Sequence, residues 1–305
     1  MTSWPEWKVM RWLDDSTLRI LYRGPLASCN YDCSYCPFAK RRDSRETLRE
    51  DALALSRFVD WAAAATAQPL AILFTPWGEG LVRRHYVDAL VRLSHLPNVQ
   101  RVAIQTNLSS NLRWVAKANT ETLALWCTYH PTQISRNAFL DRLGVLRRAQ
   151  IRFSVGIVGA RENFGEIAAL RAALDPHEYL WINALDPRPP DYYSAGEIEA
   201  LSAVDPHFAF NESPPPSLGA ACRAGSLSIS VDGDGNVRPC HFLGMRLGNL
   251  YDGTFQPRQP MKCSNSRCDC YIGYIHRTDL PVAAQFSQGS VERVWAPREF
   301  EWTPQ

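Results

Sequence analysis

The sequence lacks the long hydrophobic runs that mark membrane proteins. No uninterrupted apolar stretch reaches the roughly 18 residues of a membrane span. The first residues, MTSWPEWKVMRWLDDS, contain no basic segment followed by an apolar run, so we do not expect a signal peptide. The net charge is only +2 and the two signs are well mixed, so nothing indicates a nucleic acid or an anionic membrane as partner. These absences predict a soluble cytoplasmic protein.

Cysteine, in contrast, is abundant. The nine cysteines stand at positions 29, 33, 36, 127, 222, 240, 263, 268 and 270. Disulfides are not expected in a reducing cytosol. Eight of the nine lie in two groups, one near each end of the chain, which favours metal binding over scattered core positions. Cys127 is the exception, because it lies in the apolar run LALWC and is expected to be a small core residue.

Short apolar runs alternate with helical patterns over the first two thirds of the chain. Six strands are predicted at 17–24, 70–75, 102–107, 123–129, 152–158 and 179–185, with helices at 43–65, 82–95, 109–118, 135–149 and 163–173. This alternation predicts an α/β fold with a parallel sheet and right-handed crossovers. Six units are fewer than the eight of a closed barrel, so either an open, partial barrel or a doubly wound flat sheet is expected.

The pattern changes after residue 204. A proline-rich stretch, NESPPPSLGA, is followed by SLSISVDGDGNVRPC, in which alternating apolar residues flank Asp-Gly pairs and predict a β-hairpin. The remaining tail has little regular pattern. We therefore expect an N-terminal extension at 1–16, an α/β core at 17–205 and a small cysteine-rich β-hairpin domain at 206–305.

The first cysteine group is the loop CNYDCSYCP, which contains Cys29, Cys33 and Cys36. It follows the first predicted strand, and functional sites of parallel α/β folds lie at such strand ends. Thiolates bind iron–sulfur clusters or zinc. Structural zinc sites usually take four protein ligands, whereas no fourth ligand stands out here. Three ligands on one loop would hold a metal centre with one corner left open.

The CxxxCxxC spacing, with the aromatic Tyr35 before the last cysteine, resembles the radical S-adenosylmethionine (SAM) superfamily. The resemblance implies a partial (β/α)6 barrel whose loop cysteines bind three irons of a [4Fe–4S] cluster, while the fourth iron binds SAM. One electron from the reduced cluster would cleave SAM to methionine and a 5′-deoxyadenosyl radical, which abstracts a substrate hydrogen. Tyr35 would belong to the SAM-binding site.

The resemblance continues at the later strand ends. FTPWGEGL is similar to the family's Gly-Gly-Glu motif, which binds the amino group of SAM; Gly78 and Glu79 match, and Trp77 replaces the first glycine. QTNLS resembles the family's Thr-Asn-Gly turn, with Asn107 as a SAM contact and Leu108 in place of the glycine.

Two further SAM contacts are implied after the fourth and fifth strands. Thr128, in CTYHP, can supply the hydroxyl for which many relatives use a serine. VGIVGARE resembles the family's GxIxGxxE pattern, in which Ile157 would pack against adenine. The resemblance covers roughly residues 17–190.

The second cysteine group lies in the tail. Cys222 and Cys240 frame the predicted hairpin as C-x12-G-x4-C, which resembles the opening of the SPASM and twitch domains that carry auxiliary clusters in radical SAM enzymes. Cys263, Cys268 and Cys270 follow in a spacing that departs from the full SPASM pattern. The resemblance implies one auxiliary [4Fe–4S] cluster, held by Cys222, Cys240 and two of the three later cysteines. A structural zinc site is the alternative.

We therefore expect a radical SAM enzyme that oxidises or modifies a peptide or small metabolite, with a reductant such as flavodoxin or ferredoxin as partner. A zinc-stabilised, non-catalytic binding or scaffold protein is one alternative, and a simple electron-transfer iron–sulfur protein is another. Neither alternative would need the SAM-contacting residues at the strand ends.

Overall fold

The protein is built on one continuous nine-stranded sheet. The computed structural model describes residues 13, 16–38, 42–268, 272–286 and 292–294. The strand order is β10-β9-β8-β1-β2-β3-β4-β5-β6. The strands of this sheet are β1 (Leu18–Arg23), β2 (Leu70–Phe74), β3 (Val99–Thr106), β4 (Leu123–Tyr129), β5 (Arg152–Val158), β6 (Leu180–Asn183), β8 (Ser228–Asp232), β9 (Asn236–Arg238) and β10 (Gly248–Asn249). A separate pair joins β7 (Ala221–Cys222) to β11 (Met261–Lys262).

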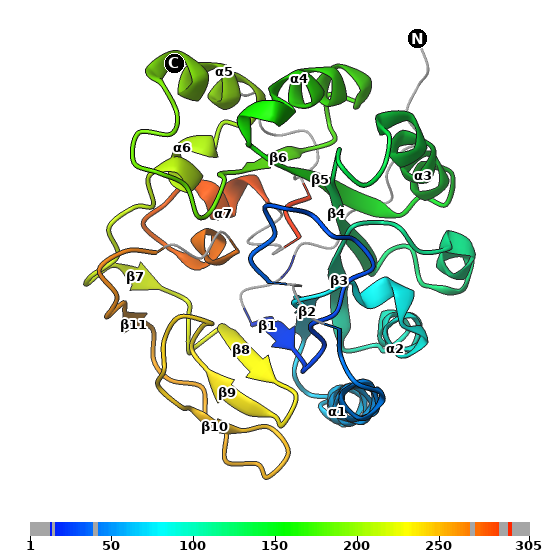
Figure 1. Cartoon of the computed structure of the whole chain (residues 1–305). Coiled ribbons are helices and arrows are strands. Elements are labelled where there is room, and N and C mark those ends of the chain that lie inside the picture. The colour runs from blue at the N-terminus through cyan, green and yellow to red at the C-terminus, as the bar shows by residue number, and fades with distance from the viewer. Residues whose placement is uncertain (1–12, 14–15, 39–41, 269–271, 287–291, 295–305) are drawn as a thin grey trace.

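Strands β1 to β6 are all parallel and neighbour one another in sequence order. They form an open arc with helices around its outside (Figure 1). A doubly wound sheet would instead reverse its strand order at a switch point. The predicted α/β fold with a partial barrel is therefore confirmed, and the flat alternative is wrong.

The helices follow the predicted alternation. They are α1 (Arg45–Ala64), α2 (Arg84–Ser94), α3 (Arg136–Arg148), α4 (Phe164–Ala173), α5 (Ala195–Val204), α6 (Phe208–Glu212) and α7 (Val282–Gln285), with 3-10 turns η1 (Gly80–Val82), η2 (Leu112–Lys117), η3 (Arg161–Asn163) and η4 (Gly273–His276). The segment predicted as a helix at 109–118 is the 3-10 turn η2. No helix among these described residues is long and apolar enough to cross a membrane.

Two apolar layers lie on opposite faces of the arc. Because side chains alternate along a strand, each strand contributes to both layers. Residues such as Ile20, Ile72 and Leu125 pack against the helices. Leu73, Trp126 and others fill the inside of the arc. Cys127 is fully buried in the helix-facing layer, which confirms it as a core residue.

The described residues after 271 return to the inside of the arc. In Figure 1 the η4 and α7 segment lies within the curve of strands. Arg101 of β3 forms an ion pair of 3.0 Å with Glu292, and both side chains are almost wholly buried. Ser154 of β5 donates a hydrogen bond of 2.6 Å to the Glu292 carbonyl. Residues nearly 200 positions apart thus complete the interior of the barrel.

The predicted hairpin is formed by β8 and β9, which pair in antiparallel fashion. It does not stand apart from the core, because β8 also pairs in parallel with β1 over five residues, from Arg19↔Ser228 to Arg23↔Asp232. Cys240, which follows β9, is therefore close to the same sheet as the first cysteine group, whereas Cys222 lies in the separate β7–β11 pair. This continuity shows that the hairpin and the α/β core share one hydrogen-bonded framework.

Candidate active site

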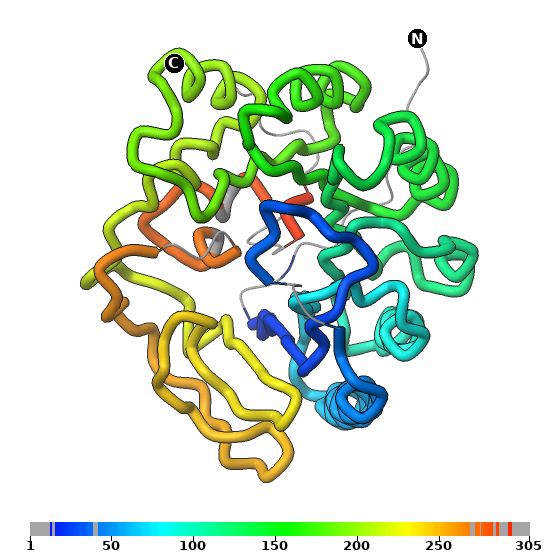
Figure 2. The backbone as a smooth tube through the Cα atoms, in the orientation of Figure 1, coloured from blue at the N-terminus to red at the C-terminus, as the bar shows by residue number. Residues whose placement is uncertain are grey.

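The first three cysteines lie on the loop between β1 and α1, at the carboxyl end of the strands. The Asn30 side chain donates a hydrogen bond of 3.0 Å to Ser109, which follows β3. The Asp32 amide donates to Gln133, which follows β4. Figure 2 shows the loop, in dark blue, extending in front of the arc of strands. The loop thus spans the open end of the barrel and contacts residues that follow the later strands.

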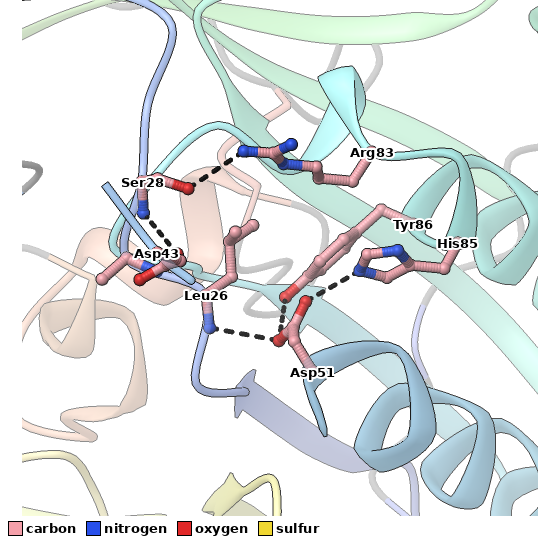
Figure 3. Close-up of polar contacts among 8 residues, drawn as sticks. Leu26, Ser28, Asp43, Asp51, Arg83, His85 and Tyr86 are labelled. Atoms are coloured by element: carbon pink, nitrogen blue, oxygen red, sulfur yellow. Dashed lines mark hydrogen bonds and ion pairs between the residues drawn. The ribbon is translucent and has the colours of Figure 1, made fainter. Parts of the chain in front are cut away.

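Carboxylates and an arginine hold the base of the cysteine loop in place. The amides of Ala27 and Ser28 each donate a hydrogen bond of 2.8 Å to the same oxygen of Asp43. Arg83 donates to the Ser28 hydroxyl at 3.0 Å (Figure 3). Hydrogen bonds to a charged acceptor are about twice as strong as neutral ones, so these contacts restrain the backbone just before Cys29.

Asp51, on α1, is a second anchor and is fully buried. One of its oxygens accepts from the Leu26 amide at 3.1 Å and from the Tyr86 hydroxyl at 3.3 Å. The other lies 2.8 Å from His85 Nε2 (Figure 3). A buried carboxylate needs such partners to offset its desolvation. Helix α1 and helix α2 are in this way both tied to the start of the cysteine loop.

Gly78 lies directly against the same loop. A Cβ atom on Gly78 would come within 1.8 Å of the Ser28 carbonyl oxygen. The Glu79 amide donates to that oxygen at 3.2 Å, and the Trp77 amide donates to the Leu26 carbonyl. Only glycine permits this approach of two backbones. The Gly-Glu segment therefore extends the pairing of β1 and β2 and positions the cysteine loop.

Glu79 joins the ends of β2 and β3 and is 2% exposed. Its carboxylate accepts hydrogen bonds from the Thr106 hydroxyl at 2.8 Å, the Leu81 amide at 2.8 Å and the Asn107 amide at 2.6 Å. Burial raises the pKa of Glu79, and these three donors act in the opposite direction. A carboxylate has about four acceptor positions, so protein groups occupy most of them.

Asn107 connects Glu79 to the cysteine loop. Its side-chain nitrogen lies 3.6 Å from Cys29 Sγ and donates to Asn30 at 3.1 Å. Leu108, which takes the place of the family's glycine, has a φ of 55°. That left-handed conformation costs a non-glycine residue roughly 1–2 kcal/mol. The Leu108 amide donates to the Thr106 hydroxyl at 2.9 Å, which stabilises the turn.

Trp77, which replaces the first glycine of the motif, contacts two side chains. The Arg23 guanidinium lies 3.8 Å from the centre of its ring. The Phe38 ring lies 4.5 Å away, centre to centre. A cation over the face of an indole is a favourable contact. The substitution therefore gives the cysteine loop a further contact with the end of β2.

The three thiols differ in burial. Cys33 is buried, while Cys29 and Cys36 are half-buried. Burial raises the pKa of the Cys29 thiol, and the Tyr31 amide, which donates to its sulfur at 3.4 Å, acts in the opposite direction. The Cys36 amide donates to the Cys33 carbonyl and closes a tight turn. Three thiols on one partly exposed loop are a donor set that suits an iron–sulfur cluster.

Tyr35 lies beside His130, at the end of β4. The Tyr35 hydroxyl and His130 Nδ1 are 2.9 Å apart, and the two rings are stacked. Burial lowers the pKa of His130 to about 4. The neutral ring can therefore accept the tyrosine proton as a hydrogen bond. This contact ties the cysteine loop to the fourth strand and gives the Tyr35 ring a defined position.

Thr128 and Ile157 lie on opposite faces of the sheet. Thr128 is half-buried and faces the same side as Gly156, since a Cβ on Gly156 would be 3.5 Å from its hydroxyl and 3.2 Å from Trp126. Ile157 is fully buried among the residues that pack against the helices. Its side chain therefore points away from the inside of the barrel, and the expectation that it contacts adenine needs correction. By alternation, Val158 faces the interior instead.

A second site gathers four cysteines of the C-terminal group. Cys222, Cys240, Cys263 and Cys268 line a single cavity. Cys270 lies outside the described residues. Among those residues, no three or more Cys, His, Asp or Glu side chains are grouped so that they could hold one metal ion. The thiols thus surround a space and do not converge on a point.

Backbone hydrogen bonds join three segments around this cavity. The Cys263 amide donates to the Ala220 carbonyl at 2.9 Å, and the Cys268 amide donates to Pro215 at 3.2 Å. The Arg223 amide donates to the His276 carbonyl at 2.9 Å. The cysteines are therefore placed by short backbone pairings between these segments.

Two arginines, Arg267 and Arg277, are among the residues that line the cavity. Arg277 forms a two-pronged ion pair with Asp279 at 2.7 and 2.5 Å and also donates to the Pro216 carbonyl. Its charge acts to lower the pKa of Cys222, although burial raises that pKa overall. His276 is 2% exposed, and burial and nearby arginines lower its pKa to about 3. His276 is therefore neutral, and Arg277 is the neighbouring cation that favours the thiolate form of Cys222.

Sequence reasoning missed the residues that support the two sites. In the sequence, Asp43 is only a polar residue at the start of the helix predicted at 43–65, and Asp51 is a polar residue within that helix. His276 and Arg277 stand in a tail without regular pattern. Asp43, Asp51 and Arg277 each have a hydrogen-bond partner 16 to 61 positions away in the chain. The one usable signal is the acidic residue at position 51, on the otherwise apolar face of the predicted helix.

Comparisons with known proteins identify solved structures of similar fold. No protein-family model matches the chain, and no curated protein matches its sequence. A structure of native anSMEcpe with bound AdoMet superposes with a TM-score of 0.51 at 15% identity, over 77% of this chain and 79% of that one. SuiB of Streptococcus suis, bound to its precursor peptide SuiA, gives a TM-score of 0.52 at 13% identity, over 79% and 65%. The chain therefore shares the α/β partial-barrel fold of these structures. In this chain the cysteine loop follows β1.

Proposed function

We propose that the chain is a radical SAM enzyme that cleaves SAM reductively and abstracts a hydrogen atom from a peptide or small metabolite. The observation that carries the proposal is the position of Cys29, Cys33 and Cys36 on one loop across the open end of the barrel. The Glu79–Asn107 framework reaches Cys29 from two neighbouring strands. A purely structural metal site would not require this convergence at the strand ends.

A [4Fe–4S] cluster held by the three thiols would supply one electron, which cleaves SAM to methionine and a 5′-deoxyadenosyl radical that takes a substrate hydrogen. The residues of the chain would orient the reactants and exclude water. Thr128 faces the barrel interior and would donate a hydrogen bond to SAM. Gly78 and Glu79 would bind its methionyl end, Asn107 would hold the loop beside it, and Tyr35 would line the same site.

The peptide alternative for the substrate has support from the solved structures of similar fold. SuiB is bound to a precursor peptide, and one anSMEcpe structure contains AdoMet and the Kp18Cys peptide, with a TM-score of 0.51 at 14% identity over 78% of this chain and 79% of that one. A reductant such as flavodoxin or ferredoxin would supply the electron, and we place the enzyme in the cytoplasm, where thiols stay reduced.

We further propose that Cys222, Cys240, Cys263 and Cys268 hold an auxiliary [4Fe–4S] cluster in a twitch-like region of residues 206–305. Four thiols around one cavity match the usual cluster ligand set. A single zinc ion would need four sulfurs within about 2.3 Å of one point. This cluster would accept the electron left on the product radical, or bind substrate.

The function is tested by reconstituting the protein anaerobically with iron and sulfide and measuring 5′-deoxyadenosine formed from SAM and dithionite. We expect the wild type to form it and Cys33→Ala to form none. Cys127→Ala is the matched control, because Cys127 is a buried core residue and is not one of the proposed cluster ligands. If Cys33→Ala forms 5′-deoxyadenosine at the wild-type rate, the assignment is wrong. A wild type that binds zinc alone and leaves SAM intact would support the scaffold alternative.

A further inference from the structure

The side chain of His276 is buried near the C-terminal cysteines. Neither ring nitrogen, Nδ1 nor Nε2, has a hydrogen-bond partner in the described structure, although the residue is only 2% exposed. Leaving a buried polar group unpaired costs about 1–3 kcal/mol. Such groups are rare in native proteins and usually have a ligand or a functional reason.

His276 is one of the residues that line the four-cysteine cavity. Of the residues that line this cavity, His276 is the only one described with a buried side-chain nitrogen that lacks a partner. Its backbone also fixes its place beside the thiols. The His276 carbonyl accepts from Arg223, and the next residue, Arg277, forms a β-bridge with Cys222. The imidazole therefore stands on a segment that is paired directly with a proposed ligand.

The described cavity already contains four thiols, which is the full ligand set of a [4Fe–4S] cluster. A fifth ligand is not needed, so the ring is better suited to donate than to coordinate. Whichever tautomer it adopts, at least one ring nitrogen of histidine carries a hydrogen. The sulfurs of a cluster accept such hydrogen bonds, and these contacts influence its reduction potential.

We propose that His276 donates a hydrogen bond to a sulfur of the auxiliary cluster and thereby raises its reduction potential. The inference rests on the proposed auxiliary cluster. Reduction adds negative charge to the cluster, and an N–H aimed at a sulfur stabilises the reduced form more than the oxidised form. His276 is thus a positioning residue that would make the cluster a better acceptor for the electron left on a product radical.

The experiment uses the full-length chain with Cys29, Cys33 and Cys36 replaced by alanine, so that only the C-terminal site is loaded. After anaerobic reconstitution, iron and acid-labile sulfide are counted, and the midpoint potential is measured by electron paramagnetic resonance during a redox titration. We expect about four irons per chain. Adding His276→Leu should keep those irons and shift the midpoint to a more negative potential.

Two further variants separate hydrogen bonding from packing. His276→Asn and His276→Gln place an N–H near the positions of Nδ1 and Nε2, so at least one of them should recover part of the shift. Met261→Leu, which changes an apolar residue of the same wall, should leave the potential unchanged. Circular dichroism melts confirm that each variant is folded.

The outcomes are distinguishable. An unchanged potential in His276→Leu, or a shift that neither amide variant reduces, overturns the role of His276. A loss of iron in His276→Leu alone also overturns it, because the histidine would then be a ligand. A parent protein that binds one zinc and no sulfide overturns the auxiliary cluster itself, and the role of His276 with it.

Discussion

At the scale of single residues, the close approach of Gly78 to Ser28 has a direct consequence. The Cβ of Gly78→Ala would overlap the Ser28 carbonyl, so the cysteine loop has to move away. We expect this variant to lose the N-terminal cluster, with total iron falling from about eight to about four per chain, and to lose SAM cleavage. Gly196→Ala is the matched control, since a Cβ there meets nothing within 4 Å. Full iron content in Gly78→Ala would show that the loop tolerates the displacement.

Thr128 and Ile157 form a second pair of test positions, because they lie on opposite faces of neighbouring strands. Thr128→Val removes a hydroxyl that faces the barrel interior and should weaken SAM binding about 2- to 10-fold, the value of one neutral hydrogen bond. Ile157→Val changes only the helix-facing core and should leave SAM affinity unchanged. Equilibrium binding of SAM to the reconstituted protein measures both. A larger loss in Ile157→Val than in Thr128→Val would contradict the assignment of faces.

At the scale of elements, the returning C-terminal segment is joined to the barrel by the buried Arg101–Glu292 pair. Glu292→Ala leaves the arginine buried without its counter-charge, which typically costs about 3–5 kcal/mol. We expect a loss of that size in the free energy of unfolding, measured by urea denaturation of the apo-protein. Asp60→Ala breaks the exposed Arg92–Asp60 pair and should cost under about 1 kcal/mol.

A double variant tests whether the stability lost in Glu292→Ala comes from the unpaired charge of Arg101 or from lost packing of the segment. Arg101→Met with Glu292→Leu removes both charges and should recover much of the stability lost in Glu292→Ala. If Glu292→Ala is no more destabilising than Asp60→Ala, the segment does not stabilise the barrel through this pair.

The elements themselves were largely predictable. The six predicted strands and four of the five predicted helices correspond to β1–β6 and α1–α4, with bounds that differ by a few residues. Apolar periodicity is a local property, so the chain displays it directly. The segment at 109–118 differs because η2 has only six residues and takes the tighter 3-10 winding. The pairing of β8 with β1 was not predictable, since strand order depends on contacts over more than 200 positions.

At the scale of the whole molecule, the continuous sheet predicts how loss of the auxiliary site would spread. Cys222→Ala should remove the C-terminal cluster and loosen the segments that surround the cavity, because bound metal offsets their small apolar core. Strand β8 should stay protected, since it is hydrogen-bonded to β1. Hydrogen exchange should therefore show lost protection at 240–268 and unchanged protection in β2–β5. Cys127→Ala is the control for removal of a thiol. Uniform loss of protection across the chain would contradict this division.

The sequence alone determined the α/β class, the cysteine loop after the first strand and the division of the cysteines into two groups. These are features of local periodicity and spacing. The tertiary structure decided which face of each strand points inward. Parallel strands buried on both sides read as continuous apolar runs, so their sequence does not distinguish Ile157 from an interior residue. It also decided which distant groups meet: Asp43 and Asp51 at the cysteine loop, Glu292 at Arg101, and His276 among four thiols. Such contacts depend on the folded path of the chain, because burial and pairing across long separations are properties of the assembled core.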